Sequence, residues 1–180
     1  MERAFVVAGG YKYCQLGEGN CVLRVPPRCR LRPVVTGWFS EFAELADEKV
    51  PGEVRYGVGA ARFAGSTYDP TSHYRAAQVF DFFEQQGLTT ELLREVSQHQ
   101  IGLLLETFRS LDVDPGVISA DEAVLLHERA GFLGLRTSTA ARLSSSLKER
   151  GVRTDFRGNV LRFGPAPYLS DAQLVTAMET

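Results

Sequence analysis

A lysine flanked by two tyrosines lies near the start of the chain, in the stretch GGYKYCQLGEGNC at residues 9–21. Lysine is scarce, since only Lys12, Lys49 and Lys148 occur and seventeen of the twenty basic residues are arginines. A lysine amine can lose its proton and act as a nucleophile or an acid/base, whereas a guanidinium stays protonated. The setting of Lys12 therefore indicates a chemical role for an amine. The plain alternative is a solvated lysine in a hairpin turn.

A second candidate is an arginine near the C-terminus, Arg162, in the stretch NVLRFGPAP at residues 159–167. Its planar, two-pronged guanidinium fits a carboxylate, so it is a candidate for holding an acidic ligand. The alternative is a strand arginine paired with a surface acid such as Asp155.

Two further stretches carry aromatic and hydroxyl side chains that could line a site. VTGWF at residues 35–39 contains the only tryptophan, Trp38, and GSTYDP at residues 65–70 contains Ser66 and Thr67. Trp38 could equally be an ordinary core or interface anchor, and loop hydroxyls are common.

Composition narrows the class of protein. With 180 residues, 44% of them hydrophobic and 23% charged, the chain has the size of one domain or of half a larger enzyme. A net charge of −2 gives no reason to expect nucleic acid or an anionic membrane as partner, and no apolar run is long enough for a bilayer. Three cysteines without a CxxC pair or histidine cluster argue against a disulfide scaffold and a metal site, and favour a reducing cytoplasm.

The N-terminal pattern predicts a strand inside a sheet. Residues 4–8, AFVVA, form a short apolar run that ends at a glycine pair, and residues 21–25, CVLRV, follow a glycine-rich turn. We expect the two segments to pair, and the first to be buried on both faces as in a large sheet. A chain that begins inside a sheet looks like the second half of a larger protein. Residues 30–39 are expected to be extended, and 44–70 an irregular loop.

Helical signals dominate after Pro70. Capping residues and apolar spacing predict one helix over 74–86 with an apolar face of Ala77, Phe80 and Phe83, and a longer one over 91–111 capped by Thr89 or Thr90. The remaining elements are expected to form a small α+β layer: a strand at 131–136, a helix at 140–150, a hairpin turning at 157–159 and a final helix capped at 170–171.

The stretch around Lys12 resembles the cofactor-lysine segment of the pyridoxal-phosphate enzymes of aminotransferase class V, most specifically kynureninase and its close relatives. VTGWF resembles the family's Gly-Trp-Phe, whose tryptophan comes from the neighbouring subunit and lies near the cofactor phosphate. GSTYDP lies where class V enzymes place a polar loop across the dimer interface. NVLRFGPAP resembles the family's Ile-Arg-Val-Ala-Pro, whose arginine holds the substrate α-carboxylate.

The resemblance implies a role for each candidate. Lys12 would bind pyridoxal 5′-phosphate covalently and act as the catalytic acid/base, and Tyr11 would turn its hydroxyl to the phosphate. Trp38, Ser66 and Thr67 would also contact the cofactor, while Arg162 would bind the substrate. The Ser-Thr pair departs from the Asn-Pro often found there in kynureninases, which bears on the aromatic part of the substrate.

The implied fold is α/β, the C-terminal half of a fold type I enzyme. Residues 1–70 would be the end of the large cofactor domain and its sheet, 71–111 the bridging helices, and 112–180 a small α+β C-terminal domain. The missing half would supply the partner of the pyridine nitrogen and the phosphate loop. We therefore expect a homodimer or a complementing N-terminal half as partner.

The implied activity is hydrolysis of the Cβ–Cγ bond of a 2-amino-4-oxo acid, with L-kynurenine giving anthranilate and L-alanine. Two alternatives stay open from the sequence. The chain could be a catalytically silent remnant or interaction module, or it could belong to another class V enzyme, an aminotransferase or a cysteine or selenocysteine lyase.

Overall fold

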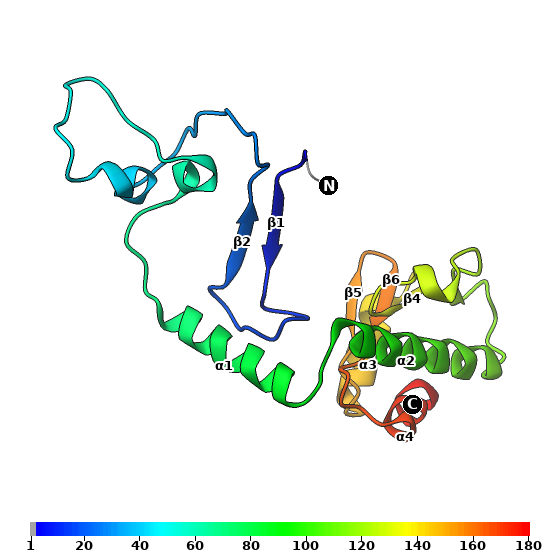
Figure 1. Cartoon of the computed structure of the whole chain (residues 1–180). Coiled ribbons are helices and arrows are strands. Elements are labelled where there is room, and N and C mark those ends of the chain that lie inside the picture. Colours follow the sequence, from blue (N-terminus) through cyan, green and yellow to red (C-terminus); the bar gives the residue numbers. More distant parts are fainter. Residues whose placement is uncertain (1–2) are drawn as a thin grey trace. The chain divides into compact units, whose positions relative to one another are not determined.

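The computed structural model describes residues 3–180, which form two compact units. The first unit ends at Gly87 and the second runs from Leu88 to Thr180 (Figure 1). The division into 1–70, 71–111 and 112–180 stays a prediction. The break at Gly87 places the two helices predicted to bridge the domains in different units.

The N-terminal strands pair as predicted. Strands β1 (Val6–Gly9) and β2 (Cys21–Arg24) form an antiparallel ribbon in which Val6 faces Arg24 and Gly9 faces Cys21. The predicted burial on both faces is wrong for the described residues, because Val7 is 79% exposed and β2 is exposed along its length. A ribbon of two strands has no layer of its own to cover either face.

The rest of the first unit consists of loops, short 3₁₀ helices and one α-helix. A 3₁₀ helix at Trp38–Glu44 replaces the end of the extended segment predicted for 30–39, and a second one, Gly59–Phe63, interrupts the predicted irregular loop. Helix α1 (Thr71–Gln85) follows Pro70 as predicted, and the chain turns away at Gly87 with a φ of +65°. Its predicted apolar face is not buried, since Ala76 is the one buried residue of α1.

The second unit is a four-stranded antiparallel sheet with three helices. The strand order is β3-β4-β6-β5, and the expected α+β layer is observed. The elements are α2 (Thr90–Ser110), β3 (Ser119–Ala120), a 3₁₀ helix at Leu126–Glu128, β4 (Leu133–Arg136), α3 (Ala140–Glu149), β5 (Asp155–Arg157), β6 (Val160–Phe163) and α4 (Asp171–Glu179). Strand β3 was not predicted, and its two residues are too short for a period-two signal.

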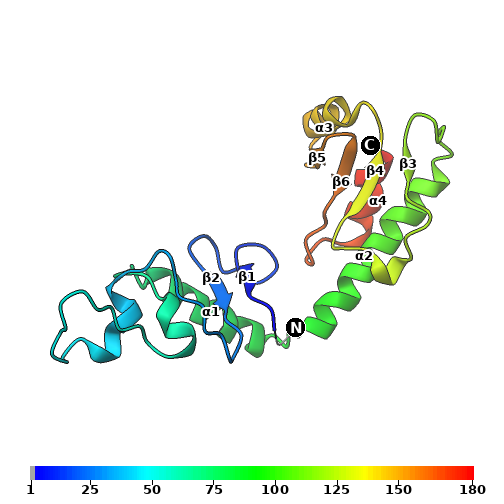
Figure 2. The same cartoon turned by 90° about the horizontal axis from the view of Figure 1, so that it is seen from above.

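Alternation along β4 and β6 separates a core from an outer face. Leu133 and Leu135 on β4 are fully buried, as is Leu161 on β6. They belong to the cluster that includes Ile101 and Leu104 of α2, and Figure 2 shows α2 and α4 beside the sheet. Because successive side chains point to opposite faces, the residues between them form the outer face.

Local signals predicted the C-terminal elements correctly. Gly158 turns the β5–β6 hairpin with a φ of +53°, and Gly151 ends α3 with a φ of +88°. The Ser170 hydroxyl accepts the Gln173 amide and caps α4. At α2 the structure decides between the two predicted caps, because the Thr89 hydroxyl accepts the Leu92 amide at 3.1 Å.

Replacing Thr89 by Ala should lower the free energy of unfolding of the second unit by about 1 kcal/mol, because it removes the acceptor of a helix-terminal amide. The matched control is Thr90→Ala, since the Thr90 hydroxyl bonds the Glu91 carboxylate and not a backbone amide. Urea unfolding followed by amide NMR signals of the second unit measures both. Equal losses in the two variants would contradict the assignment of the cap.

Candidate functional site

Lys12 lies in a closed loop between β1 and β2. The Gly10 amide donates to the Asn20 carbonyl at 2.8 Å, and the Leu16 amide donates back to the Gly10 carbonyl at 2.9 Å. Within the loop, the Gln15 amide donates to the Lys12 carbonyl at 3.0 Å. Leu16 is buried under the loop, whereas the Lys12 side chain is exposed, with its Nζ 5.8 Å from the centroid of the Tyr11 ring. The backbone therefore presents the amine outward.

The glycine pair before Lys12 is required by the chain's own side chains. A Cβ on Gly9 would lie 2.7 Å from Cε1 of Tyr11, and a Cβ on Gly10 would lie 2.5 Å from Cδ1 of Leu16. The Tyr11 ring and the Leu16 side chain occupy the space beside these two glycines.

Helix α1 fixes the far side of the same loop. Arg75 donates from Nε to the Leu16 carbonyl at 2.8 Å and from Nη2 to the Glu18 carbonyl. Asn20 donates from Nδ2 to the Ser72 carbonyl at 2.7 Å, and Figure 1 shows α1 beside this loop. Sequence reasoning missed Arg75, and no local pattern marks it, because its partners lie 57 and 59 residues away.

The structure brings together two of the predicted segments, VTGWF and GSTYDP. Trp38 Nε1 donates to Thr67 Oγ1 at 3.2 Å, and the Phe39 amide donates to the Gly65 carbonyl at 3.0 Å. A Cβ on Gly37 would lie 2.5 Å from the Gly65 carbonyl carbon, so the close approach needs this glycine. The Thr67 hydroxyl accepts from Trp38 and keeps its own proton to donate.

An aromatic cluster surrounds Trp38 and leads to α1. The Trp38 ring lies 4.3 Å from Phe39 and 5.5 Å from Phe42, and Phe39 lies 5.9 Å from Tyr68. Asp69 then accepts the Thr71 amide at 2.9 Å, and the Thr71 hydroxyl lowers the pKa of Asp69 by hydrogen bonding to it. The Trp38 side chain stays 44% exposed, so the cluster presents an open aromatic edge.

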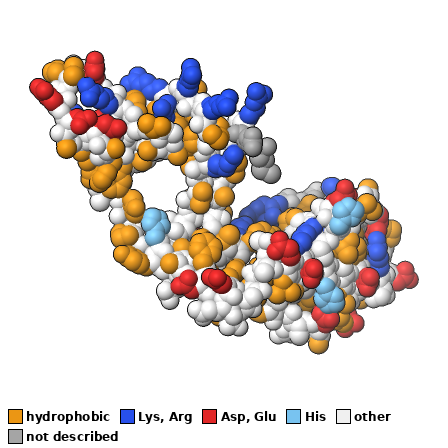
Figure 3. Space-filling model, in the orientation of Figure 1, with side chains coloured by type: hydrophobic (Ala, Val, Ile, Leu, Met, Phe, Trp, Pro, Cys, Tyr) orange, Lys and Arg blue, Asp and Glu red, His pale blue; other side chains and the backbone are white. Residues whose placement is uncertain are grey.

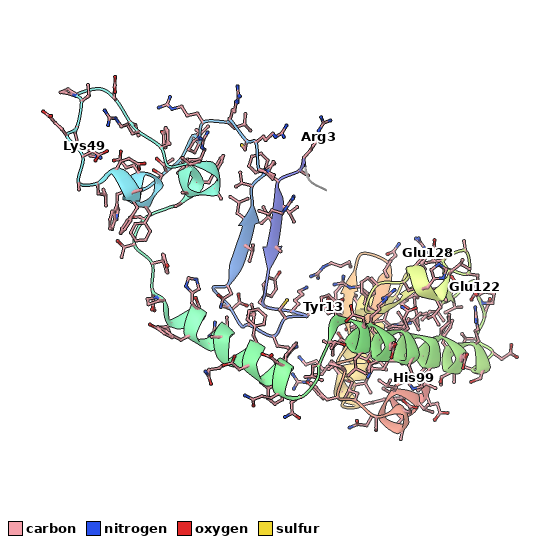
Figure 4. All side chains as sticks on the ribbon, in the orientation of Figure 1. Arg3, Tyr13, Lys49, His99, Glu122 and Glu128 are labelled. Atoms are coloured by element: carbon pink, nitrogen blue, oxygen red, sulfur yellow. The ribbon has the colours of Figure 1, made fainter. Side chains whose placement is uncertain are left out.

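The Lys12 loop and the Trp38 cluster lie in different parts of the first unit. Figure 4 shows Tyr13 at the end of the β1–β2 ribbon near α1, and Lys49 in the long loop that follows the 3₁₀ helix Trp38–Glu44. Figures 1 and 2 agree in separating this helix from the loop of residues 10–20. Within one chain, the structure does not bring these two predicted parts of the site together.

Arg162 lies on the outer face of the small sheet, between an acid and an aromatic ring. It forms an ion pair with Asp155, its cross-strand neighbour on β5, and its Cζ lies 5.3 Å from the centroid of the Phe132 ring. The hydrogen bond from Arg162 is the main cause that lowers the pKa of Asp155. The side chain is 25% exposed. A guanidinium has five N–H donors, so this pairing leaves donors for a ligand, and the carboxylate role stays a prediction.

Among the described residues, the histidines and cysteines do not form a common site. His99 of α2 hydrogen-bonds both carboxylate oxygens of Asp171 at 2.8 and 2.9 Å, which joins α2 to α4 (Figure 4). From residue 3 onward, no group of three or more His, Cys, Asp or Glu could hold a metal ion, and the three cysteines are free. In the same part of the chain, no helix is both long and apolar enough to cross a membrane.

Comparison with known proteins identifies the second unit. Residues 93–180 match the family described as kynureninase C-terminal domain. The second unit is therefore similar to a kynureninase C-terminal domain. Two curated proteins named kynureninase, from Bacillus cereus (strain ATCC 10987 / NRS 248) and Bacillus mycoides (strain KBAB4), are 28% and 29% identical to it over 172 residues. These alignments cover 89% of this chain, which spans only 37% of the length of each relative.

This finding confirms the kynureninase resemblance, but the family match covers only part of the candidate site. The matched residues include the small sheet with Arg162, whereas the Lys12 loop and the Trp38 cluster lie outside residues 93–180. The individual roles of Lys12, Tyr11, Trp38, Ser66, Thr67 and Arg162 therefore stay predictions.

Replacing Arg162 by Gln should raise the pKa of Asp155 toward its ordinary value, because the main hydrogen bond to the carboxylate is lost. Arg157→Gln is the matched control, since Arg157 acts on Asp155 more weakly. NMR titration of the Asp155 carboxyl carbon measures both. A larger shift in the Arg157 variant would show that Arg162 is not the principal partner.

The same pair predicts the sign of a pH effect on stability. The pKa of Asp155 is lowered in the folded state, so its carboxylate stabilises the fold fully at pH values above its unfolded-state pKa. This stabilisation is lost as pH falls through the folded-state pKa. Urea unfolding at several pH values should therefore show a loss of stability of the second unit at acid pH that is smaller in the Asp155→Asn variant than in the wild type.

Proposed function

We propose that the chain is part of a pyridoxal-phosphate-dependent kynureninase-like hydrolase, which converts L-kynurenine to anthranilate and L-alanine. The observation that carries the proposal is the match of residues 93–180 to the kynureninase C-terminal domain. The ordered resemblance of the segments around Lys12, Trp38 and Thr67 supports it. Because the curated relatives are much longer, the active protein would include polypeptide equivalent to their remaining length.

The residues of the first unit have the donor chemistry that the cofactor needs. The Lys12 amine has no acidic partner among the described residues and points to solvent, so it is available to an aldehyde. Hydroxyls of Tyr11, Ser66 and Thr67 are the donors proposed for the phosphate. When bound, pyridoxal phosphate supplies an electron-poor ring that stabilises negative charge on the substrate.

Each side chain has a distinct task in the proposed reaction. Arg162 binds the substrate α-carboxylate with its remaining donors and fixes the orientation of the amino acid. The Lys12 amine holds and moves a proton at the substrate Cα. Trp38 contributes its exposed ring and holds Thr67 in position through the Nε1 hydrogen bond.

The separation of the Lys12 loop from the Trp38 cluster favours a composite site. If both contact the same cofactor, they would have to come from two copies of the chain. The homodimer is therefore part of the proposal, with Trp38 and Thr67 of one copy completing the site of the other. The resemblance to enzymes whose tryptophan comes from the neighbouring subunit supports this arrangement.

A second function is favoured by the apolar surface of the first unit. Val34 is 99% exposed, and Val35, Val58 and Val7 are also largely exposed; Figure 3 shows many hydrophobic side chains on this surface. Such a surface is typical of an interaction site, so the chain alone could act as a binding module. Sedimentation velocity with and without pyridoxal phosphate separates the two functions. The enzyme must bind the cofactor as well as associate with a second copy, whereas a binding module associates without the cofactor.

Incubation with pyridoxal phosphate followed by borohydride should label Lys12 in preference to the other two lysines. Lys49 is the internal control, since it pairs with Glu41 at 3.3 Å and donates to the Glu44 carbonyl at 3.2 Å. Lys148 is an exposed helical lysine without a predicted role. Peptide mass spectrometry locates the label, and Lys12→Ala should remove it. Equal labelling of all three lysines would argue against a cofactor site.

In the assembled enzyme, Arg162→Gln should raise the KM for L-kynurenine by roughly 10- to 100-fold, since a charge-assisted contact to the carboxylate is lost. The cofactor absorption should be retained. Arg142→Gln, an exposed arginine on α3, makes the same change of charge and is the control. Loss of cofactor instead of substrate affinity would count against the role of Arg162. Activity on L-cysteine without activity on L-kynurenine would point to a lyase.

A further inference from the structure

A hollow of about 230 Å³ lies on the outer face of the small sheet, beside Arg162 but distinct from it. Its floor is formed by Gly134 of β4 and Val160 of β6. The segment between β3 and β4 forms the walls. The lining residues from that segment and the end of β4 are Asp121, Val124, Glu128, Arg129, Ala130, Phe132 and Arg136. The volume is below the roughly 300–1,000 Å³ of pockets for drug-sized ligands, so a single small ring would fill it.

Gly134 has no side chain, and this leaves the space of the hollow above β4 free. A Cβ there would lie 3.2 Å from Cγ1 of Val160 and 3.7 Å from Cε2 of Phe132, so any larger residue would crowd the hollow. The Phe132 ring lines the hollow and also contacts Arg162, whose Cζ is 5.3 Å from its centroid. With Val124 and Val160, this ring makes part of the lining apolar.

Two arginines, Arg129 and Arg136, also line the hollow. Arg129 is 8% exposed, and although its Nη2 donates to the Asp121 carbonyl, its buried Nε has no hydrogen-bond partner among the described residues. The cost of this unpaired buried donor is borne by the fold. Arg136 is 70% exposed and reaches Asp121 only at 3.9 Å. That distance is too long for a hydrogen bond.

Each of the two acids beside the hollow accepts one backbone amide. Asp121 accepts the Ala123 amide at 3.1 Å, and Glu128 accepts the Leu125 amide at 3.3 Å. Arg94 of α2 holds the same segment by donating to the carbonyls of Arg129 and His127 at 3.1 and 2.7 Å. Figure 4 shows Glu128 on this segment above β4. These contacts anchor the walls of the hollow.

We propose that this hollow binds a small planar carboxylate, with the ring against Phe132, Val124 and Val160 and the carboxylate on the exposed guanidinium of Arg136. The inference does not depend on the proposed reaction or on Arg162. Aryl carboxylates, the product class of that reaction, belong to the same ligand class.

Titration of the ¹⁵N-labelled whole chain with benzoate tests the inference. Saturable shifts are expected at the amides of Ala130, Gly134 and Val160, with benzyl alcohol binding at least about tenfold more weakly. Arg136→Gln should weaken benzoate binding roughly tenfold. Ala130→Trp, a change at an exposed wall position, should block the hollow even if the arginine variant were to unfold. Arg142→Gln should leave binding unchanged.

Three results would overturn the inference. Binding that Arg162→Gln abolishes and Arg136→Gln leaves intact would place the anion at Arg162 instead. Equal binding of benzyl alcohol would remove the role of the Arg136 guanidinium. Shifts that do not saturate, or that spread evenly over exposed arginines, would mean that no built site exists.

Discussion

The alternation of side chains along β4 and β6 is the constraint on which the second unit depends. Leu135 and Leu161 face each other on the buried side, while Arg136 and Arg162 lie on the other. A slip of one residue would turn the arginines into the helix-packed core, where an unpaired charge is very costly. The core therefore fixes which side chains face outward, and the register that stabilises the sheet also places Arg162 beside Asp155 and Phe132.

Over residues 3–87 the first unit shows no comparable core, and polar contacts together with close glycine approaches set its local geometry. Arg75 and Asn20 join the Lys12 loop to α1, and Gly37 lets the Trp38 segment approach residues 65–66. Such contacts define loops well but bury little apolar surface, so they add little stability by themselves. In the proposed enzyme, the exposed apolar side chains of this unit would be covered by further polypeptide and by a second copy.

Sequence reasoning succeeded where the determining interaction is local. Ser170 caps α4 within three residues, and Gly158 turns its hairpin by its own φ. It failed where the partner lies far along the chain. No residue near Arg75 in the sequence indicates its contact with Leu16. An apolar run such as that at β1 predicts burial but does not show which segment buries it. The hollow was missed for the same reason, since β4, β6 and the segment before β4 meet only in the folded chain.

The two outer-face arginines differ in how firmly they are held and in how exposed they are. Residue type alone does not distinguish Arg136 from Arg162 as a ligand for a carboxylate. Arg162 is held between Asp155 and the Phe132 ring and is 25% exposed, whereas Arg136 is 70% exposed with one long ion pair. A side chain already held in place loses less conformational entropy when a ligand binds. In the proposed enzyme, Arg162 would therefore be the better fixed anchor for a substrate that must be oriented for chemistry, and the more exposed Arg136 would suit the proposed ligand of the hollow, which only needs to be retained.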